Sequence, residues 1–285
     1  MTELLYSCRY GILRGLIFGK PEQPLVLALH GWLDNADSFS RLAPLLDDYC
    51  VVAVDLPGHG QSDWLGAGAE YLIWSSTTAL TELVTSHPLF CNRSFHLLGH
   101  SMGSAAALLL NSVLAERVLS YVALDALGPL TTAPEQAPQQ LAQAALAASA
   151  SSSQPRRYPN AEQALQARLR NNPELSAACI GAVVSRNLRT LESGEVQWST
   201  DPRLRLPSSV RLTDGQLSAF LQQLAAPVLV IRAEQGIIPL SVFQQRLAML
   251  PRGQLLSLPG HHHFHLEPST CAAVATAIKE FWTHV

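Results

Sequence analysis

The chain of 285 residues is long enough for one large domain, or for a core domain that carries an insertion. Hydrophobic residues make up 48% of the chain and charged residues only 14%, which excludes a disordered tail protein and a coiled coil. The net charge is −3 and the cationic residues form no basic run, so the composition argues against a nucleic-acid partner.

The cysteines and the N-terminus bear on the cellular environment. The chain has five widely spaced cysteines and no CxxC pair, which indicates neither a disulfide framework nor a zinc site. Residues 1–10 do not contain a basic region that leads into an apolar stretch and a cleavage site. No apolar run reaches the roughly 18 residues that a membrane span needs. We therefore expect reduced thiols, no membrane span and a cytoplasmic location.

Short apolar runs alternate with amphipathic segments along most of the chain, and this alternation predicts an α/β fold. The runs are rich in Val, Leu and Ile, which suits strands buried on both faces of a parallel sheet. They lie at 25–29, 51–54, 95–98, 118–124, 228–231 and 255–258. The predicted helices of this part lie at 38–46, 70–86, 101–114, 240–250 and 270–282.

The alternation stops after residue 124 and resumes near residue 227. Helices are expected here at 136–148, 161–170 and 173–186, together with a polar link at 149–159 and a hairpin at 188–198. We therefore expect a core of residues 1–128 and 207–285. Residues 129–206 are expected to form a helical cap over the carboxyl end of the sheet.

A candidate nucleophile stands in the motif Gly99-His100-Ser101-Met102-Gly103. A bare G-x-S-x-G arises by chance in roughly one such chain in ten, so the interpretation depends on its surroundings. A predicted strand precedes the motif and an apolar helix follows it, which is the context that lifts a serine hydroxyl above the sheet edge. The alternative is a glycine-rich turn in which Ser101 only caps the helix.

A serine nucleophile needs an imidazole that accepts its proton and a carboxylate that orients the imidazole. Candidates for the base follow the last predicted strand: His261, His262, His263 and His265. The same histidines could alternatively bind a metal ion. Glu267 is the only nearby ligand of another type, so no metal is expected. For the acid, Asp125 and Glu234 each end a buried strand, and both stay open; Asp125 could instead be a turn residue.

Two loops after predicted strands frame the candidate site. His30-Gly31-Trp32 follows the strand at 25–29, and the backbone amides of Trp32 and Met102 are candidates for an oxyanion hole. The alternative for the first loop is a plain turn. In the loop that begins at Asp55, a structural role is favoured over catalysis for Asp55 and His59.

Together these residues resemble the α/β-hydrolase superfamily over nearly the whole chain. The segments that resemble its serine hydrolase-like, or kraken-type, group are HGWLDNA at 30–36, LGHS at 98–101, LD at 124–125, DPRL at 201–204 and PGHH at 259–262. The resemblance implies an α/β-hydrolase fold, with a mostly parallel central sheet flanked by helices and a helical cap.

The resemblance also bears on the site residues. Its Gly-x-His pattern favours His262 as the base. The acid of the family commonly lies after the penultimate strand, near the position of Gly236 here, whereas some relatives place it one strand earlier, which matches Asp125. Epoxide hydrolases and haloalkane dehalogenases of this fold carry an aspartate at the elbow, so Ser101 implies acyl transfer to water instead.

The expected function is hydrolysis of a carboxylic ester or related small acyl substrate by Ser101, His262 and Asp125, with Glu234 as the alternative acid. No cofactor is expected. Hydrolysis of a thioester or of a carbon–carbon bond by the same triad remains an alternative. An alternative from a different functional class is a noncatalytic, ligand-binding relative of the α/β-hydrolases.

Overall fold

The computed structural model describes residues 1–151 and 154–285. Within these residues, an eight-stranded sheet has the strand order β1-β2-β4-β3-β5-β6-β10-β11. Its strands are β1 (Thr2–Cys8), β2 (Gly11–Phe18), β3 (Leu25–Leu29), β4 (Cys50–Val54), β5 (Phe95–His100), β6 (Val118–Leu124), β10 (Val228–Gln235) and β11 (Gly253–His261). The β1–β2 and β2–β4 pairs are antiparallel, and all other neighbouring strands are parallel.

The central strands are buried on both faces. Every residue of β3 and β4 is buried, as their uninterrupted apolar sequences predict. Successive side chains of β3 point to opposite faces, so Leu25, Leu27 and Leu29 join one apolar cluster while Val26 and Ala28 join another. The sheet therefore separates two hydrophobic cores.

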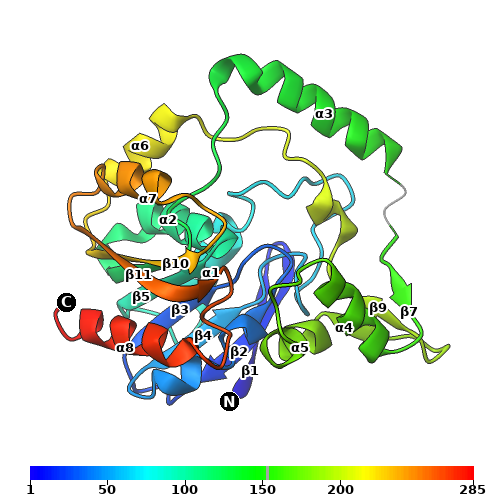
Figure 1. The fold of residues 1–285 in the computed structure, drawn as a ribbon, viewed down its shortest axis with the longest axis horizontal. Coiled ribbons are helices and arrows are strands. Elements are labelled where there is room, and N and C mark those ends of the chain that lie inside the picture. The colour runs from blue at the N-terminus through cyan, green and yellow to red at the C-terminus, as the bar shows by residue number, and fades with distance from the viewer. Residues whose placement is uncertain (152–153) are drawn as a thin grey trace.

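Helices cover both faces of the sheet (Figure 1). One core includes residues of α1 (Thr77–Ser86), α2 (Met102–Leu114), α6 (Asp214–Gln222) and α7 (Leu240–Leu247). The other core includes residues of α8 (Cys271–Trp282) and of the short 3-10 helices at Ala36–Phe39 and Ala43–Leu45. Further 3-10 turns lie at Ala115–Arg117, Pro134–Gln136 and Pro202–Arg205. The observed architecture is the α/β fold that the alternation of strands and helices predicts, and it confirms the α/β-hydrolase fold that the resemblance implies.

The structure differs from the expected elements in four places. The hairpin of β1 and β2 and the helix α6 are additional. The expected helix at 38–46 is replaced by two 3-10 turns, because Pro44 has no N–H to donate to a carbonyl in the preceding turn, so an α-helix does not continue through it. The helix expected at 70–86 begins only at Thr77.

The segment between β6 and α6 contains the elements of the expected cap. They are α3 (Ala137–Ala150), β7 (Arg157–Tyr158), α4 (Ala161–Arg170), α5 (Ala177–Arg186), β8 (Leu188–Thr190) and β9 (Val196–Trp198), and the described strands form a sheet of order β7-β9-β8. Figure 1 shows α3 arching away from the body of the molecule. The expected polar link at 149–159 includes residues 152–153, which lie outside the described residues.

Buried polar contacts attach α5 to the core. Arg186 Nε lies 3.1 and 3.0 Å from the two carboxylate oxygens of Asp55, and the amide of Asn35 donates to the Val183 carbonyl at 2.7 Å. Asp55 also accepts the N–H groups of Ala36 and Gln61. These contacts account for the buried charge of Asp55 without a role in chemistry. No helix in the described part of the chain is long and apolar enough to cross a membrane.

Candidate active site

The segment 99–103 forms a sharp turn between β5 and α2. Ser101 has φ 52° and ψ −117°, in a backbone region that side chains rarely adopt. A Cβ on Gly103 would lie 1.9 Å from the Leu29 carbonyl oxygen, so this position accepts only glycine. The N–H of Ser101 donates to the Leu124 carbonyl at 3.0 Å, which ties the turn to the end of β6. The glycines and the strained serine together lift the hydroxyl above the edge of the sheet.

Three of the predicted site residues lie in one hydrogen-bonded series. Ser101 Oγ is 2.9 Å from His262 Nε2, and His262 Nδ1 is 2.6 Å from Asp125 Oδ2. The carboxylate of Asp125 is fully buried, and its other oxygen accepts the N–H of Ala233 at 2.9 Å. Two donors therefore hold the carboxylate in one orientation, and the carboxylate in turn orients the imidazole.

The two candidate acids have different surroundings. Glu234 is exposed on β10, and its carboxylate has no hydrogen bond or ion pair within the residues that the structure describes. Gly236 stands near the position where the family commonly carries its acid, and a Cβ there would lie 2.4 Å from Asp125 Oδ1. Glycine at this position thus leaves the space that the Asp125 carboxylate occupies. The structure brings Asp125, and not Glu234, to His262.

The clustered histidines lie in different environments. His261 is exposed, and His262 is the one in contact with Ser101. His263 turns the other way, and its Nε2 lies 3.1 Å from Asp34 Oδ2. His265 is fully buried. Only one of the four candidates therefore has the position of a base.

The amides of Trp32 and Met102 lie in the loop after β3 and at the first residue of α2. Within the described parts of the chain, neither N–H has a hydrogen-bond partner, which is the state required of oxyanion donors. The indole N–H of Trp32 donates to the Leu204 carbonyl at 2.9 Å, although the residue is 50% exposed. This contact joins the first loop to residues that follow the cap strands.

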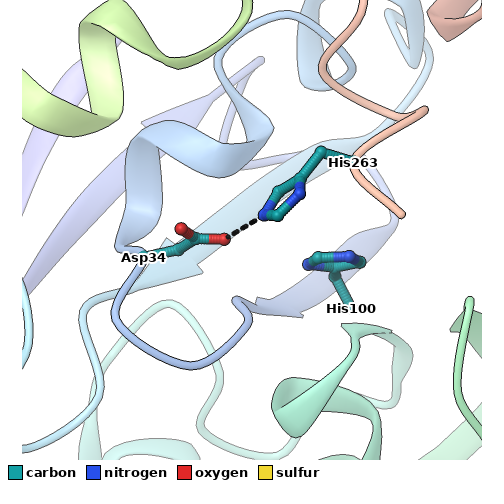
Figure 2. A group of neighbouring side chains, drawn as sticks. All are labelled: Asp34, His100 and His263. Atoms are coloured by element: carbon teal, nitrogen blue, oxygen red, sulfur yellow. Dashed lines mark hydrogen bonds and ion pairs between the residues drawn. The ribbon is translucent and has the colours of Figure 1, made fainter. Parts of the chain in front are cut away.

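A second polar group lies beside the first, and sequence reasoning did not find it (Figure 2). Asp34 binds Arg168 of α4 through one oxygen at 3.0 Å and His263 through the other. His100 Nε2 lies 2.9 Å from the carbonyl oxygen of His262. The sequence signals were the presence of Asp34 and His100 within two of the segments that carry the family resemblance, and of His263 within the histidine run.

Burial shapes the charges of this second group. Burial and the neighbouring histidines lower the pKa of His100 well below its usual value, so His100 is neutral at pH 7. Burial alone would raise the pKa of Asp34, but the adjacent His263 and Arg168 outweigh it and lower that pKa. Asp34 is therefore a carboxylate at neutral pH.

Known proteins place this architecture in a family. The sequence profile described as the alpha/beta hydrolase family matches residues 25–277. The serine hydrolase-like protein of Mus musculus is 28% identical over 295 residues, which cover 96% of this chain and 94% of that protein. The serine hydrolase-like protein 2 of Homo sapiens is 28% identical over 305 residues, and the match covers 98% of this chain and 94% of the human protein. The crystal structure of a hypothetical protein from Pseudomonas aeruginosa PAO1 has a TM-score of 0.91 at 36% identity, covering 99% of this chain and 100% of that chain. The chain therefore belongs to the alpha/beta hydrolase family and is a hydrolase similar to the serine hydrolase-like proteins.

Proposed function

We propose that this hydrolase cleaves carboxylic esters or related small acyl substrates, with Ser101 as nucleophile, His262 as general base and Asp125 as the orienting acid. The observation that carries the proposal is the continuous series of hydrogen bonds from Asp125 through His262 to the hydroxyl of Ser101. Nucleophile, base and orienting group in hydrogen-bond reach of one another are the signature of covalent acyl transfer.

Acylation begins when Ser101 Oγ attacks the acyl carbon. Its proton passes to His262 Nε2, which lies 2.9 Å away in the free protein. The imidazolium formed in this step is stabilised by the buried carboxylate of Asp125 at 2.6 Å. The same hydrogen bond keeps the proton of neutral His262 on Nδ1, so that Nε2 is free to act as the base.

The tetrahedral intermediate carries a negative oxygen that needs donors. The N–H groups of Trp32 and Met102 have no partner among the residues that the structure describes, and the Met102 N–H lies at the N-terminus of α2, where the helix dipole also favours negative charge. His262 then returns its proton to the leaving oxygen, and the C–O bond breaks to leave an acyl-serine.

Deacylation repeats the cycle with water. A water molecule attacks the acyl-serine as His262 Nε2 removes one of its protons, and the intermediate collapses with return of the proton to Ser101 Oγ. The products are a carboxylic acid and an alcohol, and the enzyme is restored. A thioester or a carbon–carbon bond would use the same residues with a different leaving group.

A fluorophosphonate probe tests the proposal, because it reacts with an activated serine and not with an ordinary hydroxyl. We expect the full-length chain to be labelled once, with the label on Ser101 by peptide mass spectrometry. The Ser101→Ala variant should keep the melting temperature of the wild type but take up no label and lose at least about 10³-fold in turnover.

A substrate panel then separates the reactions. The panel contains p-nitrophenyl esters of several acyl lengths, thioesters with the same acyl groups, and substrates cleaved at a carbon–carbon bond. We expect the esters to be hydrolysed faster than the other two classes. Faster thioester turnover would change the proposed substrate class while leaving the triad in place. Absence of both labelling and turnover in a folded sample would overturn the proposal in favour of a ligand-binding relative.

A further inference from the structure

Asp34, His100 and His263 meet at a point next to the proposed triad (Figure 2). They come from the loop after β3, the last residue of β5 and the loop after β11. One oxygen of Asp34 and one nitrogen of each histidine all lie within 4.8 Å of one another, and all three residues are buried. The sequence interpretation considered only ligands near the histidine run, whereas two of these three residues come from distant segments.

His100 presents a free lone pair to this point. Its Nε2–H donates to the His262 carbonyl at 2.9 Å, which leaves Nδ1 without a proton. Nδ1 is buried and has no hydrogen-bond partner within the residues that the structure describes. The position that a Cβ of Gly31 would take lies 2.8 Å from His100 Nδ1 and 3.3 Å from Asp34 Oδ2, so both atoms face the same space. A buried acceptor without a partner is costly, and a ligand there would recover that cost.

The other two side chains are arranged like members of a coordination shell. Asp34 Oδ2 and His263 Nε2 are 3.1 Å apart, close to the separation of about 3.3 Å for two ligands on a tetrahedral ion with bonds of about 2.0 Å. Arg168 binds only the other oxygen of Asp34, at 3.0 Å. It therefore orients the carboxylate in the manner of an outer-shell partner and leaves Oδ2 available.

We propose that Asp34, His100 and His263 bind a divalent transition-metal ion of the Zn²⁺ type. Two imidazoles and one carboxylate are a donor set that suits Zn²⁺ and other first-row divalent ions. Bonds form from the metal to Asp34 Oδ2, His100 Nδ1 and His263 Nε2. A histidine that binds a metal through Nε2 carries its one proton on Nδ1, so the proton that His263 Nε2 shares with Asp34 moves to Nδ1 of the same ring as the ion binds.

The ion inhibits the enzyme and does not take part in its chemistry, an effect that rests on the proposed function. The rings of His100 and His262 have centroids 4.7 Å apart, and His100 also holds the His262 backbone. A dication bound to His100 therefore opposes the positive charge that His262 acquires during acylation. Bound metal should lower kcat more than it changes KM.

Calorimetric titration of the metal-stripped, full-length protein with ZnCl₂ at pH 7.5 tests the site directly. We expect one equivalent of Zn²⁺ to bind with a Kd in the micromolar range or tighter. Asp34→Asn and His263→Gln should each weaken binding by at least about 100-fold, because the first replaces an anionic ligand by a neutral amide and the second removes an imidazole ligand. His261→Gln is the matched control, since this exposed histidine lies in the same run but outside the group, and it should bind as the wild type does.

Ser101→Ala separates the site from the proposed activity. This variant should bind Zn²⁺ as tightly as the wild type although it does not hydrolyse esters. Melting curves without metal check each fold; if Asp34→Asn does not fold because its pair with Arg168 is lost, His263→Gln decides alone. In the active enzyme, Zn²⁺ should lower kcat at least about tenfold, EDTA should restore it, and His263→Gln should lose this sensitivity.

Several outcomes would overturn the proposed site. One is a wild-type protein that binds no Zn²⁺ at millimolar concentration. Another is unchanged affinity in both Asp34→Asn and His263→Gln. Loss of binding in His262→Gln without loss in these two variants would put the ion on the proposed base instead.

Discussion

Replacing Asp125 by asparagine tests the proposed acid through its two hydrogen bonds. Asp125 Oδ1 accepts the Ala233 N–H at 2.9 Å, and Oδ2 accepts from His262 Nδ1 at 2.6 Å. An asparagine has one acceptor oxygen and one NH₂ donor in this place. Because the backbone N–H of Ala233 can only donate, the oxygen stays with it and the NH₂ turns to His262. The imidazole then accepts at Nδ1 and carries its proton on Nε2, where it can no longer take the proton of Ser101.

The expected loss follows from the wrong tautomer. In a serine triad, this change lowers turnover by about 10⁴-fold, which corresponds to about 5.4 kcal/mol of transition-state free energy. Both hydrogen bonds of the side chain are replaced, so the free energy of unfolding should fall by less than about 2 kcal/mol. We therefore expect a folded protein whose kcat falls by at least about 10²-fold.

The assay compares the turnover of an activated aryl ester by Asp125→Asn and by Glu234→Gln. Melting curves of both variants show whether each is folded. Glu234→Gln is the matched control, because its carboxylate is exposed and has no hydrogen bond within the described residues. It should lose less than about tenfold in kcat. The reverse ranking in two folded variants would refute the reasoning, identify Glu234 as the acid and leave Asp125 as a turn residue.

Three further predictions concern His262, Gly236 and His96. His262→Ala should lower turnover of an aryl ester by about 10³-fold or more while His261→Ala keeps most activity, and similar losses in both would contradict a single base. Gly236→Ala places a Cβ 2.4 Å from the triad carboxylate, so kcat and melting temperature should both fall; wild-type values would show that the carboxylate can move freely. Burial lowers the pKa of His96 in the folded protein to about 4. As the pH falls, His96 is therefore protonated in the unfolded chain before it is protonated in the folded protein, and the free energy of unfolding decreases. His96→Gln should therefore reduce the loss of unfolding free energy between pH 8 and pH 5 by about 2 kcal/mol in urea titrations, and an unchanged loss would contradict this account.

The buried strands could be predicted because their environment is uniform. A strand covered on both faces is apolar at every position, and β3 and β4 show this in their sequences. The strand β1 lies at the edge of the sheet, and only Leu4 of its residues is buried, so its sequence has no continuous apolar run. The helix α6 was also missed, although Thr213 and Gln216 form a capping box that marks its start.

Ser101 and His262 could be proposed from local motifs, but the acid could not be chosen in this way. Asp125 follows β6 and Glu234 lies near the end of β10, and the sequence alone does not give the order of these strands in the sheet. The structure places β6 between β5 and β10, so Asp125 lies next to the turn that carries Ser101. The absence of a side chain at Gly236 then provides the space for its carboxylate. The choice between the two acids therefore depends on the strand order and on the close approach of Gly236 to the Asp125 carboxylate, and both connect residues that are far apart in the sequence.

The second polar group shows why a pattern of neighbours in sequence is a poor guide to neighbours in space. His100 and Ser101 are consecutive, as are His262 and His263, yet each pair is divided between the two groups. Ser101 contacts His262, which contacts Asp125, whereas His100 and His263 lie with Asp34. The hydrogen bond from His100 to the His262 carbonyl links the groups through the backbone. A change at Asp34 can therefore reach the proposed base in two ways, by moving its backbone and by altering the charge beside its ring.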